Sequence, residues 1–131
     1  MYERNKDINS STTIILLCEL TKLNFNLVQA THQNELKEVS RWWENLGLVG
    51  KLNFARDRVT ESFMTGLGLV YDPKQSSYRK WIAKATALVI VMDDIYDVYG
   101  SLEVLEWDSK EIQHFPEYMK IFFSSIIRYY Q

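Results

Sequence analysis

Three aspartates within five positions carry the clearest chemistry in this sequence. An entirely apolar run, residues 88–92, is followed by Asp93, Asp94 and Asp97. Residues four apart on a helix share a face, so Asp93 and Asp97 are expected to point the same way, with Asp94 turned partly aside. Gly100 is a predicted helix stop, which places these charges near a helix C-terminus that is already negative. A positive partner is therefore expected, and a hard divalent cation with oxygen ligands suits this role.

A solvated acidic surface is the alternative, because most acidic clusters are of that kind. The preceding residues favour a site instead, since Thr86 is the only polar residue between Ala85 and Met92. A helix that passes through an apolar interior and then presents carboxylates indicates an apolar cavity with charge at its mouth. On a helical projection, four side chains extend below Asp93 and are candidates to line that cavity: Ile82, Thr86, Val89 and Ile90.

The second candidate group is the basic pair Arg56 and Arg58, which flanks Asp57. Residues two apart do not share a helix face, so bringing both arginines onto one anion requires an extended or turn backbone over Gly50–Arg58. The guanidinium group offers a planar fork of donors that matches carboxylate or phosphate oxygens. The alternative is an ordinary surface pair with Asp57 as its internal partner.

Composition narrows the class of protein. The chain has 131 residues, enough for one domain at most, and its 47% hydrophobic and 24% charged residues are typical of a globular protein. A net charge of −2 gives no reason to expect nucleic acid or an anionic membrane as partner. The single cysteine, Cys18, excludes an internal disulfide and favours a reducing compartment. No signal peptide, transit peptide or membrane-spanning run is recognised, so the cytoplasm is the default location.

Periodicity and turn signals predict helices only, and the expected fold class is all-α. The residues up to Asn9 are expected to be a loose lead-in, and Trp42 and Trp43 are expected in the core. A short acidic segment is expected at 102–108, followed by a turn at 114–116. The predicted helices are Ile14–Gln33, Leu36–Leu46 with Gly47 as its stop, Val59–Leu69, one from Gln75 or Ser76 to Tyr99, and Glu117–Tyr130.

Taken together, these stretches resemble plant terpene synthases of the class I type. The motifs that carry the resemblance are Leu23–Asn26 with Gln29, Arg41–Trp43, Phe54–Arg58, Asp93–Gly100 and Pro116–Lys120. They follow the family's order and approximate spacing over nearly the whole chain. The resemblance implies a partial α-helical bundle around an apolar cavity.

The resemblance also implies roles for the two candidate groups. Asp93 and Asp97 match the aspartates that bind Mg²⁺, with Mn²⁺ as an alternative, and Asp94 has a supporting part. Arg56 and Arg58 match the arginines that hold the diphosphate. The implied reaction is ionisation of a prenyl diphosphate to an allylic carbocation, giving a terpene and diphosphate. The residues around Phe54–Arg58 slightly favour the monoterpene branch, and hence geranyl over farnesyl diphosphate.

Several departures from the family pattern bear on activity. The second metal motif, of the form (N/D)DxxSxxxE, and the family's N-terminal helical domain do not occur in this sequence. Between Glu106 and Trp107 the sequence is shorter than the family pattern by about two helical turns. Thr65 stands where the family commonly has a cavity tryptophan. Residues 1–131 are therefore expected to be an incomplete N-terminal portion of the catalytic α-domain.

An incomplete bundle should expose apolar surface and associate with itself, so we expect marginal stability and no turnover by the isolated chain. The alternative function is that of a non-catalytic helical remnant with at most weak Mg²⁺ and diphosphate binding. Prenyl transfer also uses aspartate-rich helices, but the Arg-Trp-Trp and Arg-Asp-Arg stretches favour the synthase. A plastid location stays open for a longer parent protein.

Overall fold

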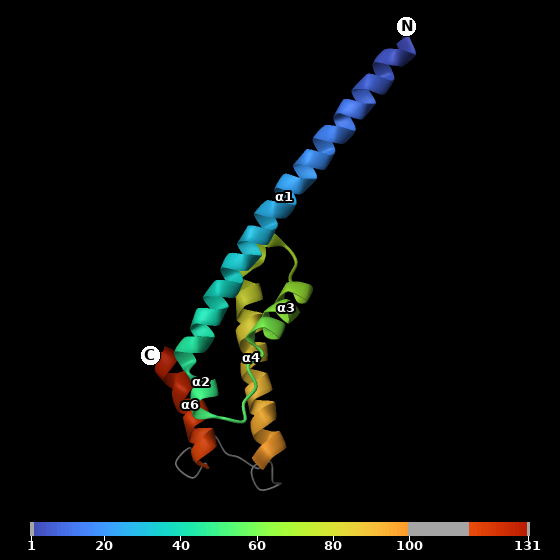
Figure 1. The fold of residues 1–131 in the computed structure, drawn as a ribbon. Helices are drawn as coiled ribbons and strands as arrows, with labels where there is room; N and C mark the ends of the chain where they lie inside the picture. The colour runs from blue at the N-terminus through green and yellow to red at the C-terminus, as the bar shows by residue number, and fades with distance from the viewer. Residues whose placement is uncertain (1, 100–115, 131) are drawn as a thin grey trace. The chain divides into compact units, whose positions relative to one another are not determined.

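The computed structural model describes residues 2–99 and 116–130, and every regular element in those ranges is a helix (Figure 1). The all-α prediction is therefore confirmed for the described part of the chain. The elements are α1 (Tyr2–Leu46), α2 (Leu48–Lys51), α3 (Val59–Leu69), the 3-10 helix η1 (Pro73–Gln75), α4 (Ser76–Tyr99) and α6 (Glu117–Tyr130). None of the helices in these ranges is both long and apolar enough to span a membrane. The chain divides into two compact units, Met1–Asn34 and Glu35–Gln131.

The predicted bounds of α3, α4 and α6 are confirmed, whereas the expected break near residues 34–35 and the loose lead-in are wrong. The break expected from Gly50 is also wrong at its start, because Gly50 and Lys51 belong to the short helix α2. Helix α1 runs from Tyr2 because its sequence contains no glycine or proline to interrupt the backbone hydrogen bonds. It ends before Gly47, which has a φ of 61° and so adopts the left-handed conformation that favours glycine. The expected segment at 102–108 and the predicted helix stop at Gly100 lie outside the described residues.

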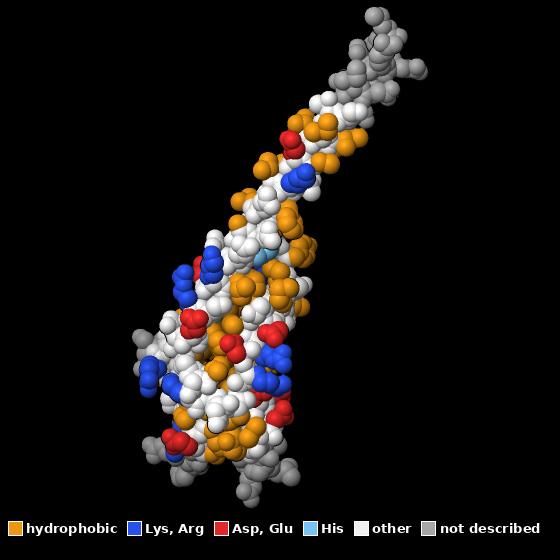
Figure 2. Space-filling model, in the orientation of Figure 1, with side chains coloured by type: hydrophobic (Ala, Val, Ile, Leu, Met, Phe, Trp, Pro, Cys, Tyr) orange, Lys and Arg blue, Asp and Glu red, His pale blue; other side chains and the backbone are white. Residues whose placement is uncertain are grey.

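The first unit consists of a helical segment whose large apolar side chains are exposed. The exposed fractions run from 57% to 68% for Ile14, Ile15, Leu16, Leu17, Leu20, Leu23, Phe25 and Leu27. Figure 2 shows apolar side chains at the surface along this segment. A helix held by tertiary packing normally buries an apolar face, so this surface is suited to association.

The second unit holds the hydrophobic core. Helix α4 contributes its small and β-branched residues at four-residue spacing, which places them on one face: Ala83, Ala87, Val91 and Ile95. The tryptophan pair is buried as predicted, with Trp42 2% and Trp43 5% exposed. Helix α6 adds Met119 and Phe122 to the same core.

Helices α3 and α4 pack closely at one glycine. A Cβ atom built on Gly66 would lie 2.7 Å from the backbone oxygen of Arg79. No side chain fits at that distance, so the absence of a Cβ permits the close approach of the two helices. Gly68, on the same helix, has no atom within 4 Å of the corresponding position. The packing of α3 on α4 therefore depends on Gly66 and not on Gly68.

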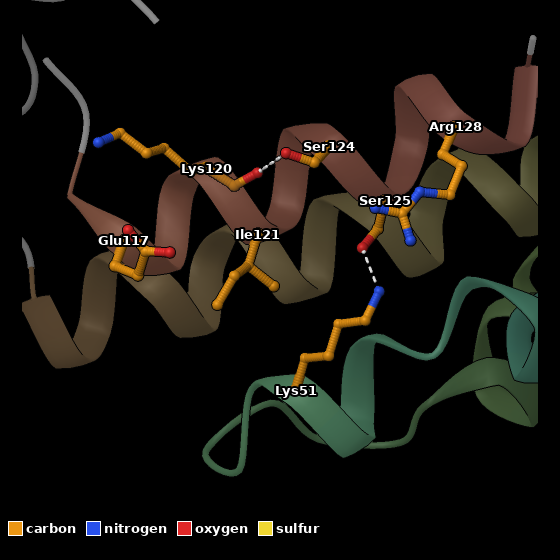
Figure 3. Close-up of a pocket in the computed structure, with 7 residues that line it drawn as sticks. All are labelled: Lys51, Glu117, Lys120, Ile121, Ser124, Ser125 and Arg128. Atoms are coloured by element: carbon orange, nitrogen blue, oxygen red, sulfur yellow. Dashed lines mark hydrogen bonds between the residues drawn. The ribbon is translucent and has the colours of Figure 1, made fainter. Parts of the chain in front are cut away.

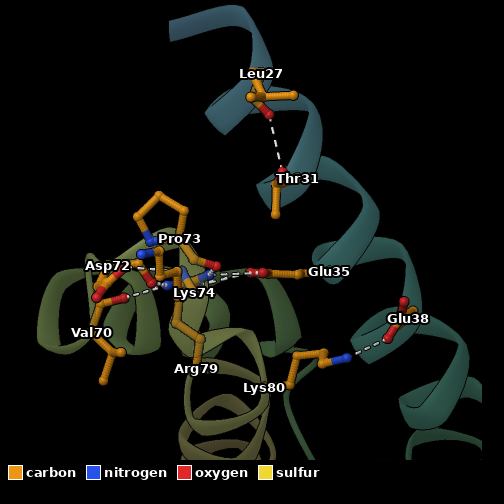
Figure 4. Close-up of polar contacts among 10 residues, drawn as sticks. All are labelled: Leu27, Thr31, Glu35, Glu38, Val70, Asp72, Pro73, Lys74, Arg79 and Lys80. Atoms are coloured by element: carbon orange, nitrogen blue, oxygen red, sulfur yellow. Dashed lines mark hydrogen bonds and ion pairs between the residues drawn. The ribbon is translucent and has the colours of Figure 1, made fainter. Parts of the chain in front are cut away.

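The fully buried side chain of Arg79 ties the connection between α3 and α4 to the rest of the unit (Figure 4). Its Nε and Nη2 donate to the carboxylate of Glu35, each at 2.8 Å. Its Nη1 donates to the carbonyl oxygens of Val70 at 2.8 Å and Asp72 at 2.6 Å, and Nη2 donates to that of Pro73 at 3.4 Å. All five guanidinium donors thus have acceptors, which makes burial of this charge tolerable.

A second cation lies close to two aromatic rings. The ammonium group of Lys84 lies 5.1 Å from the ring centroid of Trp42 and 5.8 Å from that of Tyr129. Burial and the neighbouring charge of Lys80 lower the pKa of Lys84, against the opposing influence of Glu38. The ring faces attract the ammonium, whereas burial disfavours its charged form.

Candidate functional site

An ion pair supported by a backbone hydrogen bond joins the arginine segment to the aspartate-bearing helix. Arg56 lies in the non-helical segment between α2 and α3, as the sequence predicts, and its backbone N–H donates to Oδ2 of Asp94 at 2.8 Å. Its Nε donates to Oδ1 of Asp94 at 2.7 Å, and its Nη2 contacts the same oxygen. Buried Leu52 and Ala55 hold the segment against the core. Residues 38 positions apart in the chain are thereby fixed next to each other.

The electrostatics of this pair involve the whole aspartate motif. Burial alone would raise the pKa of Asp94, but the hydrogen bonds and charge of Arg56, with a smaller contribution from Arg58, hold that pKa below its usual value. The pKa of Arg56 is raised, first by its hydrogen bond to Asp94 and also by the charges of Asp97 and Asp93. Arg56 therefore interacts electrostatically with all three aspartates. Its guanidinium supplies part of the positive charge that the cluster requires.

Asp93 and Asp97 remain exposed, whereas Asp94 is buried. This is the division expected from helix geometry, because Asp93 and Asp97 share a face and Asp94 is rotated toward the arginine segment. In residues 2–99 and 116–130, no three His, Cys, Asp or Glu side chains gather closely enough to form a metal site by themselves. Magnesium is commonly held by one or two carboxylates together with substrate phosphates, and Asp93 and Asp97 fit that donor set.

Arg58 has a different partner from Arg56. Its Nη1 donates to Oε1 of Glu61 at 2.9 Å, and its backbone oxygen accepts from the hydroxyl of Ser62 at 2.8 Å. The carboxylate of Asp57 accepts from the backbone N–H of Val59 at 3.4 Å, while the two arginines bond other carboxylates. Glu61 is a partner that was not predicted, although the three-residue spacing of Arg58 and Glu61 is a signal for such a pair.

The proposed cavity lining is placed on α3 and α4 but is not enclosed by described residues. Val89 is 66% exposed, and Ile82, Thr86 and Ile90 are partly buried. Thr65 is exposed, and its hydroxyl donates to the backbone oxygen of Glu61 at 3.1 Å. Their role as cavity residues stays a prediction.

The fold and the site define an all-α protein in which an arginine segment is paired to an aspartate-rich helix. A profile described as "Terpene synthase family, metal binding domain" matches residues 44–131. The chain is 48% identical over 133 residues to alpha-farnesene synthase from Ricinus communis, covering 95% of this chain and 23% of that protein. It is 44% identical to the chloroplastic limonene synthase from Coffea arabica, covering 95% of this chain and 22% of that protein.

Solved structures of terpene synthases are also similar to this chain. Isoprene synthase from grey poplar leaves (Populus x canescens), solved with three Mg²⁺ ions and dimethylallyl-S-thiolodiphosphate, is 42% identical with a TM-score of 0.70, over 79% of this chain and 21% of that one. The chain belongs to the terpene synthase family of enzymes, and it spans less than a quarter of the length of these relatives.

Proposed function

We propose that this chain provides the aspartate and arginine part of a class I terpene synthase site. In this proposal residues 1–131 correspond to the N-terminal portion of the catalytic α-domain. The observation that carries it is the ion pair between Arg56 and Asp94, which brings the arginine and aspartate motifs together. The Mg²⁺ and diphosphate analogue in the poplar isoprene synthase structure support the same site type.

Each residue has a distinct part in the proposed chemistry. Asp93 and Asp97 would hold Mg²⁺, with Mn²⁺ as an alternative, through their exposed carboxylates. Bound there, the ion would act as a Lewis acid that stabilises charge growing on the diphosphate. Arg58 and the exposed part of Arg56 would add oriented positive charge to the same leaving group. As the C–O bond breaks, its electron pair goes to the diphosphate and an allylic carbocation remains.

Asp94 would act through Arg56 rather than on the metal. Both its oxygens accept hydrogen bonds from Arg56, so its contribution is to hold that guanidinium beside Asp93 and Asp97. This is a more specific form of the supporting part expected from the sequence.

The substrate is proposed to be a prenyl diphosphate, with geranyl preferred over farnesyl diphosphate on the basis of the residues around Phe54–Arg58. The dimethylallyl-S-thiolodiphosphate in the poplar isoprene synthase structure supports the prenyl diphosphate class. The names of several relatives include "chloroplastic", which supports a plastid location for a longer parent protein.

Binding without turnover is the second candidate function. It is favoured by the 66% exposure of Val89, because a carbocation survives only where water is excluded. Incubation with geranyl diphosphate and Mg²⁺, followed by product analysis, distinguishes the two functions. Terpene release supports the enzyme, whereas binding without product supports the alternative.

Calorimetric titration with an inert geranyl thiolodiphosphate, with and without Mg²⁺, tests the site itself. We expect binding that requires Mg²⁺ and is lost in the Asp93→Ala/Asp97→Ala variant. Glu44→Gln, which alters an exposed acid on α1, is the matched control and should bind as the wild type does. Equal binding by the wild type and the aspartate variant would refute the assignment.

A further inference from the structure

A polar pocket lies between α2 and α6 and shares no lining residue with the aspartate site. It has a volume of about 220 Å³ and is lined by Lys51, Glu117, Lys120, Ile121, Ser124, Ser125 and Arg128 (Figure 3). None of these residues belongs to the Arg56–Arg58 segment or to the Asp93–Asp97 motif. What this pocket can bind is therefore inferred from its own lining residues.

The charge of the pocket lining is opposite in sign to that of the chain. Lys51, Lys120 and Arg128 provide three positive charges against the one negative charge of Glu117, whereas the whole chain has a net charge of −2. Like charges gathered on a small surface repel each other unless an anion lies between them. The lining thus favours an anionic ligand with a charge near −2.

The donors are concentrated at one end of the pocket. The ammonium group of Lys51 donates to Oγ of Ser125 at 3.0 Å, and Ser125 is buried with 6% exposure. Figure 3 shows the guanidinium of Arg128 on the same side as this hydrogen bond, while the side chain of Lys120 extends away from it. Because Ser125 accepts from Lys51, the bond leaves its hydroxyl proton for another acceptor. An ammonium, a guanidinium and a hydroxyl donor therefore face one region.

We propose that this pocket binds a phosphate group, with Lys51, Arg128 and Ser125 as its donors. A phosphate dianion matches the net charge of the lining, and its oxygens accept from a guanidinium fork and an ammonium at once. The flexible side chain of Lys120 provides a further cation at the rim. Binding at this pocket needs no metal ion, since the donors are all cationic or neutral. The proposal is independent of the function assigned to Asp93 and Asp97.

Titration of the ¹⁵N-labelled chain with inorganic phosphate, in buffer containing a metal chelator, tests the proposal directly. We expect saturable shifts of the amide signals of Lys51, Ser125 and Arg128, and at least tenfold weaker binding in Lys51→Met and in Ser125→Ala. Ser125→Ala removes a single oxygen and serves where a charge substitution disturbs folding. Parallel titration with inorganic diphosphate shows whether the pocket takes one phosphate group or two.

Two control variants separate binding at this pocket from a general effect of charge and from binding at the proposed diphosphate site. Lys74→Met removes an exposed cation from η1 and changes the net charge by the same amount as Lys51→Met, so it should leave phosphate binding unchanged. Arg58→Gln should also leave it unchanged, because that residue belongs to the proposed diphosphate site. Absence of saturable binding, or equal weakening by Lys74→Met and Lys51→Met, would overturn the proposal. Loss of binding in Arg58→Gln would do so as well.

Discussion

The buried pair of Arg79 and Glu35 gives the sharpest test of how the second unit is held together. The side chain of Arg79 is 0% exposed and that of Glu35 is 4% exposed, and the pair shares two hydrogen bonds of 2.8 Å. The hydrogen bonds and charge of Glu35 raise the pKa of Arg79 despite its burial, so the arginine stays charged at any practical pH. Removing one partner therefore leaves the other as an uncompensated buried charge.

We expect Arg79→Met to lower the free energy of unfolding by about 3–5 kcal/mol, the usual cost of breaking a buried pair from one side. The variant also removes the donor from three backbone oxygens in the connection between α3 and α4. Glu35→Gln should cost about 3 kcal/mol, because it keeps an acceptor oxygen but removes the charge. In the double variant Glu35→Met/Arg79→Met, the free energy of unfolding should fall by less than the sum of the two single decreases. We expect the difference to be about 2 kcal/mol or more.

Urea unfolding followed by circular dichroism measures these differences, provided that the slope with denaturant stays constant. Lys80→Met is the matched control, since Lys80 lies next to Arg79 and forms an exposed pair with Glu38 at 2.7 Å. Its loss should cost below about 1 kcal/mol. Arg79 and Glu35 do not act as a coupled buried pair if Arg79→Met costs no more than Lys80→Met, or if the losses of the two single variants are additive in the double variant.

Three further predictions concern packing, pH and association. Gly66→Ala should destabilise the chain by about 1–3 kcal/mol, because the added Cβ overpacks against α4. Gly68→Ala faces open space and should stabilise the chain by about 1 kcal/mol. Urea unfolding measures both changes. Because the pKa of Lys84 is lowered in the folded state, the free energy of unfolding of the wild type should rise relative to that of Lys84→Met as the pH rises toward about 10.4. Urea unfolding of both proteins over this pH range measures the difference, and a constant difference would contradict the prediction. Sedimentation should show concentration-dependent self-association that Leu20→Glu weakens, and a wild type that stays monomeric at every concentration would contradict the inference from the exposed apolar surface.

The elements whose limits depend on local signals could be predicted from the sequence. Gly47 ends α1 because its left-handed backbone conformation favours glycine, and the observed bounds of α3 are those predicted. The predicted break within α1 is wrong because polar residues near 33–35 resemble a turn, although the segment has no glycine or proline to interrupt it. In this chain, local residue types therefore predict where a helix ends better than they predict that a long helix continues.

The contacts between distant charges could not be derived in the same way. The partners Arg79 and Glu35 are 44 positions apart, and periodicity contains no information on such a pairing. One signal was present, because Arg79 lies four residues before Ala83 in the series of buried positions on α4. An arginine in register with a buried stripe indicates a charge that must have an internal partner.

The structure also divides the aspartate cluster into two parts. Its three charges predict a cation, and Arg56 supplies part of that positive charge through Asp94. Since one carboxylate is engaged by the arginine segment, Asp93 and Asp97 are the two that the proposed site assigns to a metal ion. The sequence order Asp-Asp-x-x-Asp therefore corresponds to two tasks. The residue rotated off the shared face fixes the arginine, and the two residues that share the face stay exposed to a ligand.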